Sequence, residues 1–178
     1  MIHLARTAAV CVEAQLQGPV TMGEQCAVHP GASLCSSGGP IILGERCFVE
    51  DGALLVNDAP DEMQIGSNNL FESGCVVQSR RVGDGNWFEP KSQAQKGSVI
   101  GSNCFIGSGV VVAAGEHIRD NTILVVVQTP QGDIRRVTRE QKDYLIATHA
   151  GLIQKYADIF PRGSKSAYAL EKHHELRQ

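Results

Sequence analysis

Aromatic side chains are scarce in this chain of 178 residues: five Phe, three Tyr and one Trp make up 5% of it. The interior therefore has to be built from aliphatic and small side chains. No apolar run approaches the roughly 18–20 residues that a membrane-spanning helix needs, so we expect no membrane insertion. The N-terminal stretch also lacks the pattern of a secretory signal, which favours a cytoplasmic protein.

A strong net charge is missing as well, since the formal value is −3. No global positive field points to a nucleic acid, and we expect no such partner. The charge is nevertheless uneven. Residues 1–128 carry 7 basic and 13 acidic side chains, whereas residues 129–178 carry 9 basic and 6 acidic ones. This asymmetry predicts a chain of two parts, an acidic body and a mildly basic tail.

Gly is abundant, at 19 residues, and its positions reveal a six-residue repeat. A frame that starts at Met22 puts an apolar residue first in all sixteen units, the last of which begins at Ile118. The fifth position is small in twelve units, and the fourth is Gly or Asn in ten. Because Gly and Asn tolerate positive φ, the fourth position predicts a turn. The first and fifth positions then point into the interior.

Three such units close one coil of about eighteen residues, and successive coils stack by parallel β pairing at roughly 4.8 Å per coil. An earlier coil runs through Val10 and Leu16. The repeat thus predicts an all-β fold over residues 1–128, a hexapeptide-repeat solenoid in the form of a parallel β-helix of about six coils.

The repeat is irregular at one place in the coil. Successive coils start 21, 22, 17, 18 and 18 residues apart, and each departure from eighteen falls in the third unit. The departures therefore stack on one edge of the prism, in the segments Ser36–Pro40, Ala59–Gln64 and Ser79–Arg81. Insertions in solenoids often mark the binding face, although they can also be tolerated surface loops. The candidate partner-binding residues at this edge are Asp58, Asp61, Glu62, Arg80 and Arg81.

The pattern changes after Leu124. We interpret residues 129–137 as a linker, residues 138–160 as an amphipathic helix, and residues 161–178 as a partly disordered tail. Thr138 is the expected N-cap, and Pro161 and Gly163 end the helix. The helix should pack along the prism and cover its last coil with one apolar face. That face consists of Leu145, His149, Leu152, Tyr156 and Ile159.

No catalytic, cofactor or metal site is expected. A zinc centre of the carbonic-anhydrase type needs three converging histidines. Only His29 and His117 fall within the predicted coils, about five coils apart. An acyltransferase needs a positioned base, and neither histidine has an evident carboxylate to orient it. The acidic residues at the turns, such as Glu50, Asp51 and Glu72, are interpreted as solvated charges.

The six cysteines also have a structural explanation. Cys26, Cys47, Cys75 and Cys104 all occupy the fifth position of the frame, where a small buried side chain is required, and are expected to stack coil on coil. No CxxC pair is present. We therefore expect these thiols to behave as small hydrophobic groups rather than as ligands or disulfide partners.

Several stretches resemble the dynactin subunit 6 family: Pro40–Glu45, Ser67–Cys75, Val82–Asn86 and Ile134–Val137. The resemblance spans roughly residues 8–160 and implies a left-handed β-helix with a C-terminal helix. Handedness is implied by the family and not by the spacing, since crossover connections are usually right-handed.

The resemblance also implies a function. It describes a non-catalytic scaffold subunit of the dynactin pointed-end complex, in the cytoplasm and on the cytoskeleton, which supports the docking of cargo adaptors for dynein-driven microtubule transport. The implied partners are dynactin subunit 5 as heterodimer partner, actin-related proteins of the pointed end, and dynein cargo adaptors. The alternative is a hexapeptide-repeat acyltransferase or an enzyme like γ-carbonic anhydrase, because both use this scaffold.

Overall fold

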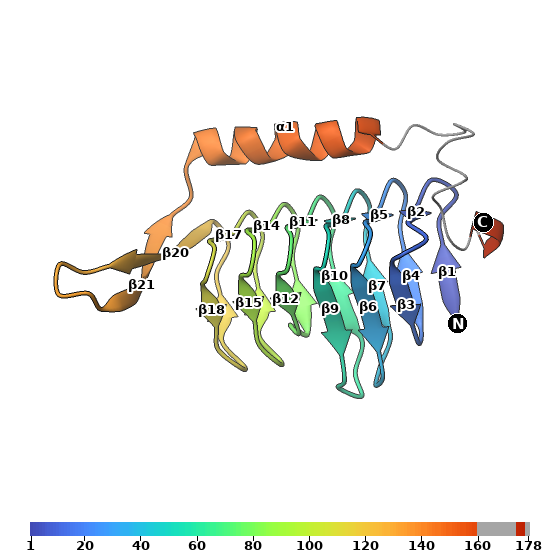
Figure 1. Cartoon of the computed structure of the whole chain (residues 1–178), viewed down its shortest axis with the longest axis horizontal. Helices are drawn as coiled ribbons and strands as arrows, with labels where there is room; N and C mark the ends of the chain where they lie inside the picture. The colour runs from blue at the N-terminus through green and yellow to red at the C-terminus, as the bar shows by residue number, and fades with distance from the viewer. Residues whose placement is uncertain (160–173, 177–178) are drawn as a thin grey trace.

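The structure is a computed structural model that describes residues 1–159 and 174–176. Short strands wind into stacked coils, and a single long helix lies along one side of the stack (Figure 1). Among the described residues, no helix is long and apolar enough to cross a membrane. The predicted fold class, a parallel β solenoid with one C-terminal helix, is confirmed.

The coils generate three sheets, one on each face of a triangular prism. The first sheet contains β1 (Ile2–Leu4), β4 (Val20–Met22), β7 (Ile41–Leu43), β10 (Met63–Ile65), β13 (Arg81–Val82), β16 (Val99–Ile100) and β19 (His117–Ile118). The second contains β2 (Ala9–Val10), β5 (Ala27–Val28), β8 (Phe48–Val49), β11 (Leu70–Phe71), β14 (Trp87–Phe88), β17 (Phe105–Ile106), β20 (Thr122–Gln128) and β21 (Ile134–Glu140). The third contains β3 (Gln15–Gln17), β6 (Ser33–Ser36), β9 (Leu54–Asn57), β12 (Val76–Val77), β15 (Gln93–Ala94) and β18 (Val111–Val112).

We call the turns from the first to the second sheet the first edge, those from the second to the third sheet the second edge, and those back to the first sheet the third edge. Strands β1–β18 make six complete coils, and β19 and β20 begin a seventh. The earlier coil expected through Val10 and Leu16 is present, and its first strand is β1.

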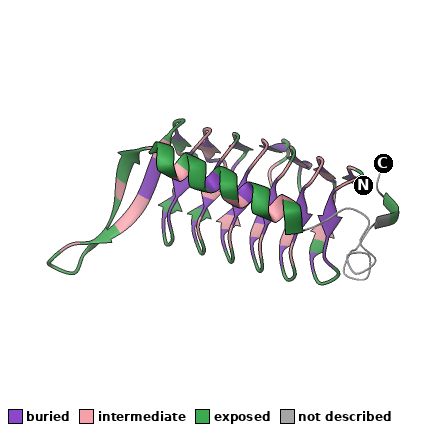
Figure 2. Ribbon diagram, turned by 90° about the horizontal axis from the view of Figure 1, so that it is seen from above, coloured by how far each residue is buried: buried purple, intermediate pink, exposed green. Residues whose placement is uncertain are grey.

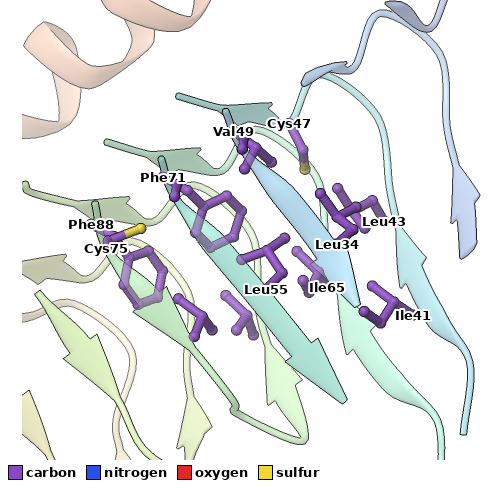
Figure 3. Packing of buried hydrophobic residues seen from close by; sticks show 14 of the residues in the cluster. Leu34, Ile41, Leu43, Cys47, Val49, Leu55, Ile65, Phe71, Cys75 and Phe88 are labelled. Carbon is purple, nitrogen blue, oxygen red and sulfur yellow. The ribbon is translucent and has the colours of Figure 1, made fainter. Parts of the chain in front are cut away.

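The register of the strands follows the six-residue frame. Met22 pairs with Leu43, and Leu43 with Ile65. The first residues of all sixteen units are buried and meet inside the prism, where Leu34, Leu55 and Phe71 lie close together in Figure 3. Two Phe side chains stack there, Phe71 on Phe88, with ring centroids 5.0 Å apart. The core is thus aliphatic with few aromatic rings, as the composition predicts.

The fourth position of the frame is a turn in the left-handed region. All ten Gly and Asn residues predicted there have positive φ, for example Gly52 at 68° and Asn68 at 57°. Gln25, Arg46 and Lys91 occupy the same position with positive φ, although a side chain of this kind is strained there. Stacking in register therefore fixes the turn even where the residue type does not favour it.

The predicted linker at residues 129–137 is wrong beyond its turn. Residues 134–140 form β21, which pairs antiparallel with β20 along its whole length, from Thr122 opposite Glu140 to Gln128 opposite Ile134. Only Thr129–Asp133 is a turn, closed by a hydrogen bond from Thr129 N to Asp133 O of 2.7 Å. Extended pairing is preferred because it satisfies the backbone groups that the two strands direct toward each other.

The helix α1 (Asp143–Ile159) begins five residues later than predicted, because Thr138 is part of β21 rather than an N-cap. The Gln141 side chain accepts a hydrogen bond from the Lys142 N–H at the helix start, and Asp143 places a negative charge in the first turn. Residue 160, Pro161, Gly163 and the predicted disordered tail lie outside the described residues, apart from a short 3₁₀ helix, η1 (His174–Leu176).

The position of α1 corrects a second expectation. The helix packs along the prism, as predicted, but it covers the second sheet rather than the last coil. Its buried stripe is visible from above in Figure 2. Ile153 is the most buried residue of that stripe, 2% exposed, whereas Ile159, predicted to belong to it, is 64% exposed.

The hairpin of β20 and β21 contacts the end of the last coil instead. Arg136 of β21 reaches back to the coil and donates a hydrogen bond of 3.0 Å to the carbonyl of Val111, on the edge strand β18. The same guanidinium pairs with Glu116. This ion pair lowers the pKa of the Glu116 carboxyl, mainly through the hydrogen bond from Arg136.

Candidate partner-binding surfaces

The first edge is held from inside by a ladder of buried side chains. In five successive coils the fifth residue of the first unit donates a hydrogen bond to a carbonyl of the next coil. The five donors are Cys26, Cys47, Asn69, Asn86 and Cys104. The acceptors are the carbonyls of Gly44, Gly66, Gly83, Gly101 and Arg119. A thiol and a carboxamide thus fill the same structural role, because both fit the corner and both carry a donor.

As Cys26 does with its thiol, Asn86 both donates and accepts a hydrogen bond in this ladder. Its amide nitrogen donates to Gly101 O at 2.9 Å, and its amide oxygen accepts the N–H of Cys104 at 2.8 Å. The residue is fully buried. The solvent side of the same edge has a second ladder, in which Asp84 accepts the N–H of Ser67 and Asp120 that of Ser102. Every coil of this edge is therefore occupied by contacts to its neighbours.

The third edge holds its longer loops together in a different way. Asn57, at the end of β9, is 6% exposed, and its amide nitrogen donates to three carbonyls: Gly39 at 2.8 Å, Pro40 at 3.1 Å and Asp61 at 2.8 Å. The loop before β7 is thereby fastened to the loop before β10. Gly39 is required beneath that loop, because a Cβ atom there would lie 2.2 Å from Asp61 O. The spacing of the repeat locates this edge but does not reveal the buried Asn57.

The five predicted binding residues are all exposed on or beside the third edge. Asp58 forms an ion pair of 3.0 Å with Lys96, a residue two coils away that the sequence analysis did not single out. Arg80 lies in the turn, where its N–H donates to Ser98 O. Arg81 belongs to β13 and lines a groove of about 340 Å³ on the first sheet together with Gln64. The structure thus spreads the predicted cluster over an edge and an adjoining face.

The three faces of the prism differ in what covers them. On the second sheet the outward side chains include Ala27, Phe48 and Leu70, and they are buried beneath α1. The outward residues of the first sheet include Gln64, Arg81 and His117, which are exposed. The third sheet presents a partly exposed apolar row instead. Leu54, Val76 and Val111 lie in one row that Gln93 interrupts, and Val56 lies beside it.

Aromatic contacts fasten α1 to the second sheet. Tyr156 stacks on Phe48, with ring centroids 5.2 Å apart, and lies 5.7 Å from the ring of His29. Closer to the start of the helix, His149 packs against Trp87, with ring centroids 6.2 Å apart. The Trp87 indole N–H donates to Glu72 at 3.0 Å. Because of this hydrogen bond Glu72 is a half-buried structural acceptor and not the solvated turn charge expected from the sequence, and burial raises its pKa.

The histidines of the coils and of α1 lie apart from one another, except that His29 and His149 both lie where α1 packs on the second sheet. His29 has a carboxylate nearby that the sequence did not reveal, since its Nδ1 lies 3.9 Å from Asp51 Oδ1. Burial nevertheless lowers the pKa of His29, and Tyr156 lies over its ring. His3 also lies within a coil, on β1, contrary to the expectation that only two histidines do. In the part of the chain that the structure describes, no three His, Cys, Asp or Glu side chains cluster as metal ligands would.

The cysteines occupy structural positions, although their stacking differs from the prediction. Cys26, Cys47 and Cys104 share the first edge, whereas Cys75 lies at the second edge above Ala53. Burial raises the pKa of the Cys75 and Cys104 thiols, and a hydrogen bond with Cys47 together with burial raises that of Cys26. A protonated thiol is the form that can donate in the ladder, and it is a poor nucleophile.

The solved structures that share this fold differ from the relatives that share its sequence. The family profile described as "Bacterial transferase hexapeptide (six repeats)" matches residues 81–114. A solved structure of a putative acetyltransferase from Bacillus cereus has a TM-score of 0.76, covering 94% of this chain and 91% of that one at 19% identity. A hexapeptide transferase family protein from Anaplasma phagocytophilum has a TM-score of 0.59 at 15% identity, covering 89% and 90%. At such identities the likeness is one of fold.

The relatives with higher sequence identity are not named as transferases. Dynactin subunit 6 of Danio rerio is 36% identical over 69% of this chain and 69% of its own length. The protein of the same name from Xenopus tropicalis is 36% identical over 69% and 67%. The one from Dictyostelium discoideum is 33% identical over 85% and 82%. These matches cover two thirds or more of each relative.

Proposed function

The chain belongs to the dynactin subunit 6 family, and on that premise we propose that it is a scaffold subunit of the dynactin pointed-end complex. In this role it supports the docking of cargo adaptors for dynein-driven transport along microtubules, in the cytoplasm and on the cytoskeleton. Its family is one of complex subunits rather than of transferases, and the chain is no enzyme. The similarity to the subunits of three distant organisms is the observation that carries the proposal.

The third edge supports the proposal as a contact surface. Asp58, Asp61, Glu62, Arg80 and Arg81 are exposed there, while the buried Asn57 holds the loops through backbone carbonyls rather than through these charged side chains. Exposed charges at a rim contribute to specificity and association rate more than to the fold. We therefore assign this edge to a protein partner, with dynactin subunit 5 as the heterodimer partner and actin-related proteins and cargo adaptors as further neighbours.

The enzyme alternative rests on fold likeness alone. It predicts a homotrimer that binds zinc or an acyl-CoA, because such enzymes build their sites between identical prisms. The groove on the first sheet and the groove at the end of the prism are lined by neither the half-buried His29 nor the buried His149, the two imidazoles whose pKa values burial lowers.

Light scattering and elemental analysis of the purified full chain test the assignment. We expect a chain that is not a trimer, carries no stoichiometric zinc, and forms a one-to-one complex when mixed with dynactin subunit 5. Acyl-CoA titration serves as the matched comparison, and no heat of binding is expected. A homotrimer that binds zinc or acyl-CoA and ignores dynactin subunit 5 would contradict the proposal.

A further inference from the structure

The longest strands of the molecule lie outside the regular coils. Strands β20 and β21 have seven residues each, whereas the described coil strands have two to four. Their hairpin projects beyond the last coil, at the end of the prism far from the N-terminus (Figure 1). Strand β21 is the terminal strand of the eight-stranded sheet, so one of its edges pairs with β20 and the other has no strand beside it among the described residues.

The flanking hydrogen bonds show which backbone groups face the unpaired edge. Thr129 N donates to Asp133 O at one end of the hairpin, and Gln141 N donates to Asn121 O at the other. Hydrogen-bonded and non-hydrogen-bonded pairs alternate in an antiparallel ladder. The odd-numbered residues of β21 therefore bond to β20. The even-numbered residues, Ile134, Arg136, Thr138 and Glu140, direct their N–H and C=O groups to the unpaired edge.

The side chains of β21 and of the two residues after it are predominantly basic. Residues 134–142 carry four basic side chains and one acidic one. Arg136 is engaged by Glu116 and Val111, and this contact anchors the hairpin to the last coil. Arg135 and Arg139 are exposed. Like charges oppose pairing of β21 with its counterpart in a second copy, whereas an acidic strand would be attracted.

A groove of about 460 Å³ adjoins the same edge. It is bounded by the last coil, through His117, Ile118 and Asn121, and by the β21 side chains Arg136 and Thr138. Backbone groups for main-chain pairing and space for alternate side chains therefore occur together, as in sites that recognise extended peptides by strand addition.

We propose that the free edge of β21 binds an extended acidic segment of a partner protein by β-strand addition. The segment pairs with the outward N–H and C=O groups of the four even-numbered residues. Its acidic side chains meet Arg135 and Arg139, and alternate side chains enter the groove at the end of the prism. This site is separate from the third edge and does not depend on the assignment to dynactin.

The probe for the test is a synthetic peptide of alternating Glu and Val, as long as the seven residues of β21. Amide hydrogen exchange of the full chain is followed by NMR as the peptide is added. We expect protection of the Ile134, Arg136, Thr138 and Glu140 amides to rise by about tenfold at saturation, because they gain a partner. The odd-numbered amides already bond to β20 and should change little. A peptide of alternating Lys and Val should not bind.

Two variants separate main-chain pairing from charge. Thr138→Pro removes one outward N–H and should weaken binding by about tenfold. Its matched control, Thr138→Val, keeps the N–H and should bind like wild type. The double variant Arg135→Glu/Arg139→Glu keeps every backbone group and should reverse the preference to the Lys peptide. If Thr138→Pro does not fold, this double variant still tests the proposal.

Three results would overturn the proposal. The first is that the Glu and Lys peptides bind equally well, or that neither binds, at millimolar concentration. The second is protection that falls on the odd-numbered amides. The third is a concentration-dependent dimer of the chain that protects the even-numbered amides without peptide, because the occupant would then be a second copy.

Discussion

The first and third edges of the prism carry the same repeat but use their side chains differently. At the first edge the turns keep a constant length, and Cys26, Asn69 and Asn86 donate hydrogen bonds to the next coil. At the third edge the turns vary in length, and the charged residues Asp58 and Arg80 are exposed. The comparison indicates that the first edge maintains the stack, whereas the third leaves side chains available to a partner.

The largest effect is expected at the first edge. Asn86→Ala removes a buried donor and a buried acceptor, and leaves Gly101 O and Cys104 N–H without partners. The free energy of unfolding should fall by about 2–4 kcal/mol. Urea denaturation followed by circular dichroism measures it. The control is Asn121→Gly, at the exposed side of the same edge with φ of 57°, which should change stability by less than about 0.5 kcal/mol. If both variants lost the same free energy of unfolding, the buried ladder would stabilise the prism no more than the exposed turn does.

A smaller effect is expected for the buried residue of the third edge. Asn57→Ala removes one donor from the carbonyls of Gly39, Pro40 and Asp61. Gly39 O still accepts from Ser36 Oγ, Pro40 O still accepts from Met63 N, and Asp61 is exposed to water. We expect a loss of about 1–2 kcal/mol. Hydrogen exchange should increase mainly in residues 37–40 and 58–62 and leave the first edge unchanged. A loss as large as that of Asn86→Ala, with exchange increased throughout the prism, would show that both edges maintain the stack alike.

Acidification should destabilise the docking of α1 on the second sheet more than it destabilises either edge. Burial lowers the pKa of His149, so the unfolded segment binds a proton more readily than the docked helix. Helix docking is therefore at full strength above the ordinary histidine pKa of about 6.5, and weakens as the pH falls through the lowered value. Hydrogen exchange of residues 143–159, corrected for intrinsic rates, should rise more between pH 7.5 and pH 5 than that of either edge.

The matched variant for this comparison is His149→Gln. It removes the titrating group and should reduce the pH dependence of helix exchange; His29, whose pKa burial also lowers, would account for what remains. Helix protection that is the same at pH 7.5 and pH 5 in the wild type would contradict this assignment.

The smallest effect on stability is expected for the exposed charges of the third edge. Arg80→Glu/Arg81→Glu changes side chains that face water, so the free energy of unfolding should move by less than about 0.5 kcal/mol. Lys91→Glu/Lys155→Glu makes the same change in net charge away from this edge. Thermal denaturation of both double variants is the measurement. A stability loss confined to the third-edge variant would mean that Arg80 or Arg81 supports the fold.

The sequence predicts the coils well because each six-residue unit repeats the same steric requirement. Sixteen apolar positions and ten turn positions agree on one frame, and a single register satisfies them. It also identifies the third edge, since insertions change the spacing. The sequence does not predict the side-chain ladder, because the fifth residue of most units is small and Asn69 and Asn86 depart from that pattern. Their role appears only when Gly83 O and Gly101 O lie above them.

The tail was predicted less well. Ile134–Glu140 has no turn residue to separate it from a helix start, and Thr138 with Gln141 fits a capping pattern by chance. Pairing with β20, which is a tertiary contact, decides in favour of the strand. The Asp58–Lys96 ion pair was missed for a similar reason, because its partners are brought together only by the stacking of coils.

Affinity isolation of the native complex tests the central claim most directly. Tagged wild-type chain, Arg80→Glu/Arg81→Glu and Lys91→Glu/Lys155→Glu are each recovered from cells, and dynactin subunit 5 and actin-related proteins are quantified by mass spectrometry. We expect wild type and the Lys91→Glu/Lys155→Glu control to recover both partners, and the third-edge variant to lose them while remaining folded. Recovery of only a homotrimer of the wild-type chain, or equal recovery by all three proteins, would contradict the account.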